Sequence, residues 1–283
     1  MIRFEFGEVQ LTVLDGGSLW LDGGAMFGIV PKVLWERERT PDEQNRIRLA
    51  MNLLLIEDGR ERTLVDTGAG DKWDAKGRAI YRIEARSAAE ILAPAGLRPE
   101  QIDRVINTHL HFDHAGGNTV RREDGTLAAA FPNASYVVQQ AELDTAAWDH
   151  ERIRASYFPD NYAPLQRDGR LFPVVGDAAL GPRIRLRHAP GHTPGMQLVL
   201  VETAEGTVAF MADLLPTASH APYPWIMAYD LEPLVTFAVK KRVLPEALAD
   251  GWWLVLEHDA ACPLATLHEV AGRLRLRPHE VEA

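Results

Sequence analysis

The stretch that decides the fold reads Thr108-His109-Leu110-His111-Phe112-Asp113-His114-Ala115-Gly116-Gly117-Asn118. It places three histidines and one aspartate within six residues, a density that no packing pattern of a strand or helix requires. Buried and unpaired polar groups at this density cost free energy unless a cation gathers their lone pairs. We therefore interpret the stretch as part of a metal site.

Further candidate ligands follow other predicted strands. The stretch itself comes after a short apolar run, residues 103–108, and His192 breaks the alternating strand at residues 184–190. Asp213 follows residues 207–212, and His258 follows the apolar residues 252–256. The complete set is His109, His111, Asp113, His114, His192, Asp213 and His258. These residues exceed what one four-coordinate zinc uses and fit two adjacent metals with a bridging hydroxide, with a single-metal site as the alternative.

The pattern around this site is that of an α/β protein. Residues 47–55 alternate with period two, and Asp58-Gly59 turns the chain into residues 62–68, which predicts a hairpin. Ser87 and Glu90 match a capping box at the start of a helix that Gly96 ends. This helix leads directly to the strand before His109, and helices between strands must cover a sheet face.

The other segments give coarser predictions. We expect a first strand at residues 10–15 closed by Gly16-Gly17, and then an apolar, glycine-punctuated loop at residues 19–35 that covers a pocket or packs on the core. Helices are predicted at residues 140–148 and 231–243, and an edge hairpin at residues 267–276. Residues 150–172 are an aromatic substrate lid or a surface excursion. The whole chain, residues 1–283, is expected to form one domain.

Composition limits the function classes. Lysine and arginine total 30 against 40 for aspartate and glutamate, and the net charge of -10 opposes binding to nucleic acid or anionic membranes. No signal peptide and no apolar run of about 18 residues is present, so we expect a cytoplasmic protein. Cys262 is the only cysteine, so any metal must be held by His and Asp.

The ordered set His-x-His-x-Asp-His and later single His, Asp and His resembles the metallo-β-lactamase superfamily over most of the chain. The resemblance implies a four-layered αβ/βα sandwich with two divalent ions, zinc being expected first and Mn, Co, Fe or Ni as alternatives. His109, His111 and His192 would hold one ion, Asp113, His114 and His258 the other, and Asp213 would bridge them. Asp66 matches a family carboxylate that supports a ligand histidine, with turn capping as its alternative role.

Within the superfamily, the wording of the motif resembles the quorum-quenching lactonases and the methyl parathion hydrolase type. The zinc β-lactamases that use a cysteine ligand are a poor match, and so are the basic RNA-processing enzymes. Glyoxalase II has a basic C-terminal segment, of which only Arg273, Arg275 and Arg277 are present here. The lactonases carry a tyrosine three residues after the bridging aspartate, where this chain has Pro216. His220, Tyr223 or Tyr229 could replace it, although His220 fits a plain hydrogen-bonding role equally well.

The resemblance implies hydrolysis of an ester or lactone bond by the bridging hydroxide, with Asp113 or Asp213 accepting a proton. Alternatives are phosphotriester or thioester hydrolysis, an iron-dependent oxidation, and a non-catalytic binder. We expect a small and fairly apolar substrate, no nucleic acid or membrane partner, and leave a homodimer open. The predicted catalytic side chains are Asp113, Asp213, Tyr229 and His220. The predicted substrate-lining side chains are Phe27, Ile29, Tyr223, Trp225 and Met227.

Overall fold

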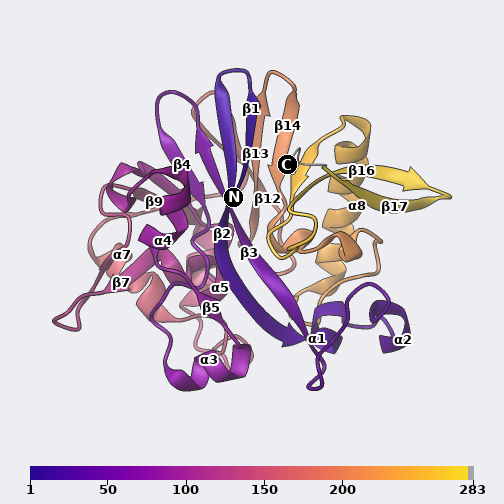
Figure 1. Ribbon diagram of the computed structural model, residues 1–283, viewed down its shortest axis with the longest axis horizontal. Coiled ribbons are helices and arrows are strands. Elements are labelled where there is room, and N and C mark those ends of the chain that lie inside the picture. The colour runs from indigo at the N-terminus through magenta and orange to yellow at the C-terminus, as the bar shows by residue number, and fades with distance from the viewer. Residues whose placement is uncertain (280–283) are drawn as a thin grey trace.

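The computed structural model describes residues 1–279, which form two large sheets (Figure 1). The first sheet has the strand order β1-β2-β3-β4-β6-β9-β10, with β5 paired to β2. Its strands are β1 (Ile2–Phe6), β2 (Val9–Asp22), β3 (Arg46–Glu57), β4 (Arg62–Val65), β5 (Glu84–Ala85), β6 (Arg104–Ile106), β9 (Ser135–Gln139) and β10 (Leu171–Val174). Strands β4, β6, β9 and β10 run parallel, so the residues that follow them lie at one edge of the sheet.

The second sheet has the order β11-β12-β13-β14-β15-β16-β17. Its strands are β11 (Ala178–Leu180), β12 (Ile184–His188), β13 (Gln197–Thr203), β14 (Gly206–Phe210), β15 (Trp253–Val255), β16 (Leu264–Val270) and β17 (Arg273–Pro278). The β16–β17 hairpin forms one edge of this sheet, which confirms the predicted edge hairpin. A separate small hairpin joins β7 (Thr119–Arg121) to β8 (Leu127–Ala129).

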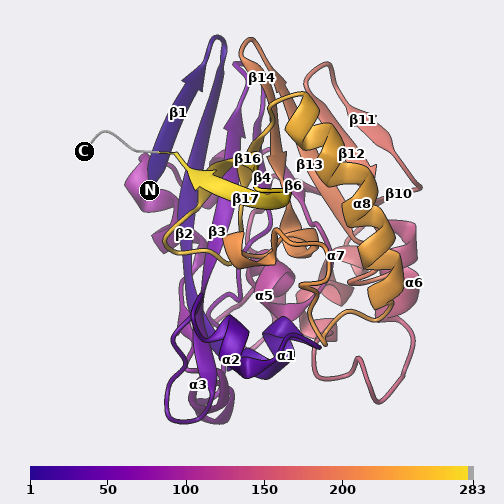
Figure 2. The same cartoon turned by 90° about the vertical axis from the view of Figure 1, so that its right-hand side faces the viewer.

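Helices cover the outer faces of both sheets. The helices are α1 (Gly23–Phe27), α2 (Lys32–Trp35), α3 (Ala75–Tyr81), α4 (Ala88–Leu92), α5 (Phe112–Ala115), α6 (Gln140–Ala146), α7 (Ala163–Arg167) and α8 (Pro233–Ala249). The 3-10 turns are η1 (Ala93–Ala95), η2 (Pro99–Gln101), η3 (Gly116–Asn118), η4 (Pro159–Asn161), η5 (Ala212–Leu214) and η6 (Ala218–His220). Figure 2 shows the long helix α8 lying across the second sheet.

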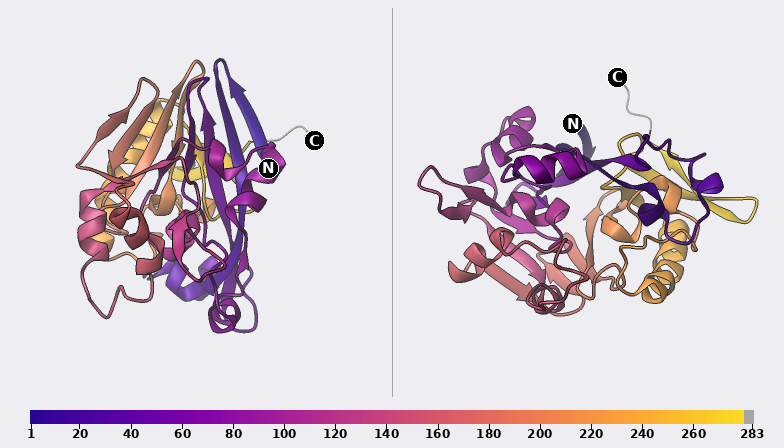
Figure 3. Two further views of the ribbon diagram at one scale, coloured as in Figure 1. Left: turned by 90° about the vertical axis from the view of Figure 1, so that its left-hand side faces the viewer. Right: turned by 90° about the horizontal axis from the view of Figure 1, so that it is seen from below.

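The period-two pattern of β3 explains how the layers pack. Leu54 and Ile56 point into the core between the two sheets, which belongs to the same apolar cluster as residues of β12 to β16 and, on the far side of the second sheet, of α8. Leu53 and Leu55 point to the opposite face, where Leu92 of α4 covers them. An α-β-β-α order of layers follows, which confirms the predicted αβ/βα sandwich. Seen from below, the N-terminal and C-terminal halves lie side by side (Figure 3).

Three predictions about local structure differ from the structure. Strand β2 does not end at Gly16-Gly17 but continues to Asp22, because a register shift between Asp15 and Ser18 absorbs the glycines and lets β5 pair there. Residues 19–35 are not one loop: they complete β2 and then form α1 and α2. Helix α8 extends to Ala249, beyond the predicted end at residue 243 and past Pro245. The capping box at Ser87 and Glu90 is confirmed.

Candidate metal centre

The seven candidate ligands lie together where strands of both sheets end. The four ligands of the motif lie after β6 and at the start of α5. Helix α5 lies between the two halves, at the lower edge of the sheets in Figure 1. His192 follows β12, Asp213 lies in η5 after β14, and His258 follows β15. All seven are at most 8% exposed, so their polar atoms have little access to water. The structure therefore brings together every residue that the sequence predicted as a ligand.

The ligand atoms form adjacent groups. Within each group they lie within 4.8 Å of one another, and the groups are His109, His111 and His192; Asp113, His114 and His258; and His109, His114 and Asp213. Asp213 spans the first two: its Oδ2 lies 3.1 Å from Nε2 of His192, and its Oδ1 lies 3.1 Å from Nε2 of His258. One carboxylate thus presents an oxygen to each group, as a bridging ligand would.

The lone pairs of these side chains fit a metal ion. Nε2 of His109 and Nε2 of His114 are buried and have no hydrogen-bond partner. Nε2 of His192 faces Nδ1 of His111 at 3.0 Å, and each of these atoms carries a lone pair unless a proton or a cation lies between them. Unpartnered buried nitrogens are costly, and imidazole and carboxylate ligands suit divalent ions such as zinc. The residues present therefore fit such ions.

Partners outside the ligand set orient the imidazoles. Asp66 accepts a hydrogen bond from Nδ1 of His114 at 3.0 Å, and Asp230 accepts one from Nδ1 of His192 at 3.0 Å. The carbonyl of Ala50 accepts from Nδ1 of His258 at 2.8 Å. Because these acceptors cannot donate, the proton lies on Nδ1 and the Nε2 lone pair is free for a ligand.

Asp66 itself is held in a strained conformation. Its φ is 56°, in the left-handed region that few non-glycine residues adopt. Its carboxylate accepts from the backbone and hydroxyl of Thr108 at 2.7 and 2.6 Å. Strain of this kind persists only where the surroundings fix it, often beside functional groups. These contacts support the predicted role of Asp66 and connect β4 to the residues that follow β6.

Two outer carboxyl groups were missed in the sequence. Asp230 lies in a loop, 38 residues from the histidine that it contacts, and no local pattern indicates such a pair. Glu257 precedes His258 and is fully buried, with Oε2 2.9 Å from Nδ1 of His114. Burial raises the pKa of Glu257 to about 8, although His114 lowers it. In the sequence, the only indication of a role for Glu257 is its position beside a ligand at the end of a strand.

Burial and neighbouring charges set the protonation of the ligands. Burial lowers the pKa of His109 and His111 well below the ordinary value, and the adjacent imidazoles lower it further. Both rings are therefore neutral, as metal ligands must be. Burial alone would also lower the pKa of His192 and His258, but the carboxylate of Asp213 raises it, so a metal ion that binds these two rings must displace their protons. Burial would raise the pKa of Asp213, but His192, His258 and the other nearby imidazoles hold it well below its usual range. Asp213 thus remains a carboxylate.

A cavity of about 190 Å³ opens beside the ligands. Its lining combines ligand residues with apolar and aromatic side chains: Leu21, Met26, Leu49, Tyr81, His111, Phe112, Asp113, Ala155, Ser156, His192, Asp213, Met227, Tyr229 and His258. We call it the central cavity. Of the predicted substrate-lining residues it includes Met227, and of the non-ligand catalytic candidates it includes Tyr229.

The other four predicted lining residues lie elsewhere, which corrects that prediction. Phe27 is fully buried in the core because α1 places it between Trp35 and His220, with ring centroids 5.4 and 4.9 Å away. Ile29 follows α1 and is 87% exposed. Tyr223 and Trp225 line a different cavity of about 570 Å³, against residues of the β16–β17 hairpin.

The catalytic prediction for His220 is also corrected. The Nε2 atom donates to the carbonyl of Met26 at 2.9 Å, and Nδ1 accepts from the hydroxyl of Thr217 at 2.8 Å. Burial lowers its pKa to about 3. Both nitrogens are thus occupied, the ring is neutral, and His220 does not line the central cavity. It has the plain hydrogen-bonding role that the sequence left open.

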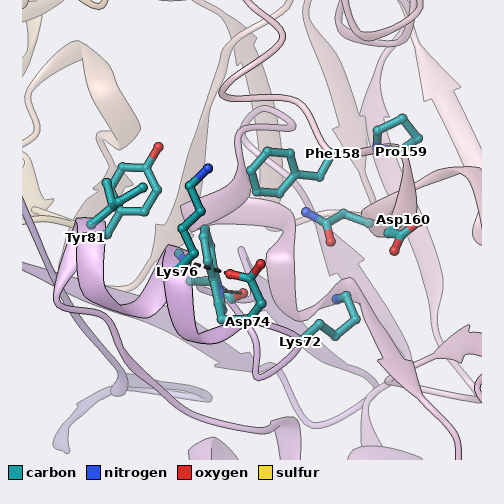
Figure 4. A pocket seen from close by; sticks show the side chains of 12 residues that line it. Lys72, Asp74, Lys76, Tyr81, Phe158, Pro159 and Asp160 are labelled. Atoms are coloured by element: carbon teal, nitrogen blue, oxygen red, sulfur yellow. Dashed lines mark hydrogen bonds between the residues drawn. The ribbon is translucent and has the colours of Figure 1, made fainter.

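Two further cavities flank the central one. A cavity of about 420 Å³ shares Tyr81 with it, and Trp73, Tyr81 and Phe158 provide aromatic walls (Figure 4). Lys76 rises between Tyr81 and Phe158 in this view, whereas the ammonium of Lys72 is held by the carbonyls of Gly116 and Thr119. We call this the aromatic cavity. On another side, a cavity of about 220 Å³ shares His111, Ser156 and Tyr229 with the central cavity.

Comparison with known proteins places this site in a family context. Residues 48–258 match the sequence model of the metallo-beta-lactamase superfamily. An N-acyl homoserine lactonase of a Bacillus species is 32% identical over 176 residues, which cover 58% of this chain and 62% of the lactonase. The chain thus matches less than two thirds of the length of this relative.

Two other relatives match more of the chain. The acyl-coenzyme A thioesterase MBLAC2 of Gallus gallus is 25% identical over 231 residues, which cover 75% of this chain and 76% of the thioesterase. The crystal structure of a probable metal-dependent hydrolase from Staphylococcus aureus superposes with a TM-score of 0.88 at 30% identity, covering 98% of this chain and 100% of that one. In residues 1–279, no helix combines the length and apolar character needed to cross a membrane.

Proposed function

The chain belongs to the metallo-beta-lactamase superfamily, and we propose that it is a metal-dependent hydrolase that cleaves an ester or lactone bond of a small, fairly apolar substrate. The observation that carries this proposal is the pair of ligand groups joined by Asp213, with unpartnered lone pairs on His109 and His114. A purely structural cluster would have satisfied these buried nitrogens with hydrogen bonds.

Each ligand has a role in this proposal. His109, His111 and His192 would hold one ion, Asp113, His114 and His258 a second, and Asp213 would contact both. Two divalent ions, when bound, would supply Lewis acidity that polarises a carbonyl oxygen and favours ionisation of water near neutral pH. Zinc is expected first. The low pKa of Asp213 keeps an ionised carboxylate beside the reacting groups.

Tyr229 is the side chain that we propose to bind the substrate carbonyl. It lines the central cavity together with His192, Asp213 and His258. Burial raises its pKa above the ordinary value, so the phenol keeps its proton and can donate a hydrogen bond at neutral pH. It would thereby take the role of the lactonase tyrosine, whose position in this chain is occupied by Pro216. Asp113 or Asp213 would accept a proton from the attacking water.

The walls of the cavities support an apolar substrate part. Leu21, Met26, Leu49 and Met227 line the central cavity, and the aromatic cavity continues beyond Tyr81. Apolar walls with a few convergent polar groups are typical of sites for small molecules. The lactonase relative supports the ester or lactone class, because its name specifies an N-acyl lactone.

A substrate panel tests this proposal. Acyl-homoserine lactones, aryl esters, thioesters and a phosphotriester would be assayed with protein loaded with zinc, manganese or cobalt. We expect the highest kcat/KM for a lactone or aryl ester, and loss of turnover on chelation. Thioester hydrolysis is the second candidate, which the similarity to the acyl-coenzyme A thioesterase favours. Purified protein with one iron per chain and oxygen-dependent thiol oxidation would contradict both.

A further inference from the structure

The cavity of about 220 Å³ behind Tyr229 has the chemistry of an anion site. It is lined by His111 of the motif, by Arg152, Ile153 and Ser156 from the segment after α6, and by Ala228, Tyr229 and Leu231 from the segment before α8. We propose that this cavity, here called the Arg152 cavity, binds a carboxylate group of the substrate close to the scissile bond. This inference rests on the proposed hydrolase function and specifies its substrate class.

The guanidinium of Arg152 has N–H groups that make no hydrogen bond within residues 1–279. Its Nη2 donates to the carbonyl of Ala228 at 3.0 Å, which ties the segment after α6 to the segment before α8. Unlike Arg154, which pairs with Asp149 at 2.9 Å, Arg152 has no ion pair with an acidic residue among residues 1–279. A guanidinium presents five N–H groups in a fixed fork that matches a carboxylate. The remaining groups are therefore available to a ligand.

A second donor lines the cavity. Ser156 lines it, and its hydroxyl makes no hydrogen bond to another residue within the described part of the chain, whereas the one phenolic proton of Tyr229 is the donor proposed for the substrate carbonyl. Ile153 and Leu231 supply the apolar part of the wall. No aspartate or glutamate is among the lining residues. One cation, one free hydroxyl and no acid form a combination that favours an anion over a cation.

The size and charge of the cavity indicate a monoanion. A single arginine with one neutral hydroxyl balances one negative charge, whereas a phosphate dianion usually meets several cations or backbone N–H groups. His111 and Tyr229 line both this cavity and the central one, so a bound carboxylate would lie a few atoms from the ligands. The aromatic cavity shares a different residue, Tyr81, with the central cavity.

A substrate with two different ends fits this arrangement. Its apolar part would lie toward Tyr81, its carboxylate toward Arg152, and the ester or lactone bond between them. The sequence led us to expect a small and fairly apolar substrate, and the Arg152 cavity makes this substrate a monoanion. The competing explanation is that Arg152 only latches two loops together through the carbonyl of Ala228.

Two esters of the same shape separate these explanations. The probes are 3-carboxyphenyl butanoate and its neutral counterpart 3-carbamoylphenyl butanoate, with the released phenol measured by chromatography. Wild type should have the lower KM for the carboxylate. In Arg152→Gln this preference, expressed as the ratio of the two KM values, should fall about tenfold, as expected for loss of a charge-assisted hydrogen bond. Arg152→Lys should keep part of it, and the neighbouring Arg154→Gln should keep all of it.

Binding measurements make the result independent of turnover. The amide analogues 3-(butanoylamino)benzoate and 3-(butanoylamino)benzamide would be titrated into the metal-loaded protein by calorimetry. We expect the benzoate to bind more tightly, with an advantage that Arg152→Gln removes and added salt weakens. Equal binding of both analogues to wild type and Arg152→Gln, with equal KM for both esters, would overturn the anion site while leaving the hydrolase intact. Arginine-dependent benzoate binding without hydrolysis of either ester would instead overturn the hydrolase function.

Discussion

Nε2 of His192 lies 3.0 Å from Nδ1 of His111, inside a site where both rings are buried. Burial lowers the pKa of His111, and the neighbouring imidazoles lower it further, so this ring is neutral and offers a lone pair. Both rings would hold a divalent ion, and such an ion would bind only the folded chain. Ligand binding of this kind stabilises by about 4 kcal/mol when the free metal exceeds its Kd a thousandfold.

We therefore predict that chelation lowers the melting temperature by about 10 °C and that zinc restores it. Differential scanning calorimetry, combined with metal analysis of the same samples, measures this change. His111→Ala should lose both the bound metal and most of the zinc-dependent shift. A melting temperature that is identical with chelator and with zinc would contradict the metal site.

The outer partner of His192 gives a second prediction. Asp230 accepts the Nδ1 proton of this ring at 3.0 Å and is itself buried. Asp230→Asn keeps the shape but weakens the acceptor, so the affinity for metal should fall about 10- to 100-fold, as is typical when such a partner is removed. Competition with a chromophoric chelator measures the affinity. Asp144→Asn, at an exposed position in α6, is the matched control, and equal affinities for the two variants would refute the role of Asp230.

Tyr229 and Tyr223 form a matched pair for catalysis. The former lines the central cavity, and the latter lines the separate cavity against the β16–β17 hairpin. Tyr229→Phe should lower kcat for an aryl ester about 100-fold, because a donor to a developing oxyanion is worth about 3 kcal/mol, and it should leave the metal content unchanged. Tyr223→Phe should change kcat less than twofold. Steady-state kinetics with metal analysis decides, and similar kcat values for both variants would remove Tyr229 from the mechanism.

How much the sequence predicted depended on the range of the interactions. Local patterns in the sequence predict the motif from His109 to His114 and the apolar strands that precede His192, Asp213 and His258. Because the strands of a sheet lie side by side, the residues that follow them are brought together. The contact between Asp230 and His192 joins loops whose path no periodicity describes. Phe27 was misplaced for a related reason: its apolar neighbours fit both a pocket lid and a core helix, and only the stacking on Trp35 and His220 distinguishes the two.

His220 provides a prediction for acid stability. Its pKa is about 3 in the folded protein against an ordinary value of 6.5, because burial disfavours the charged ring. Between these values the unfolded chain binds a proton that the folded chain does not. The resulting stability is fully present above pH 6.5 and is lost as the pH falls toward 3, at up to about 1.4 kcal/mol per pH unit.

His220→Gln removes the imidazole that binds this proton in the unfolded chain, while the glutamine amide can still donate to the carbonyl of Met26. Urea denaturation at several pH values should therefore show that the stability difference between wild type and variant shrinks as the pH falls from 6.5. The other histidines are common to both proteins and cancel in this comparison. Parallel stability curves would show that His220 does not stay neutral in the folded protein.

The wall between the central and aromatic cavities gives the last prediction. Tyr81 lines both cavities and contacts Phe112 and Trp73, with ring centroids 5.0 and 5.6 Å away. If an apolar acyl part extends past this ring, each buried methylene contributes about 0.8 kcal/mol to binding, so longer esters should be preferred until the cavity is filled. Tyr81→Ala removes the shared wall and should reduce the preference for a hexanoyl over an acetyl aryl ester about tenfold in kcat/KM. Ile29→Ala, at a residue 87% exposed, should leave that preference unchanged. A reduction in both variants, or in neither, would show that the acyl part does not lie against Tyr81.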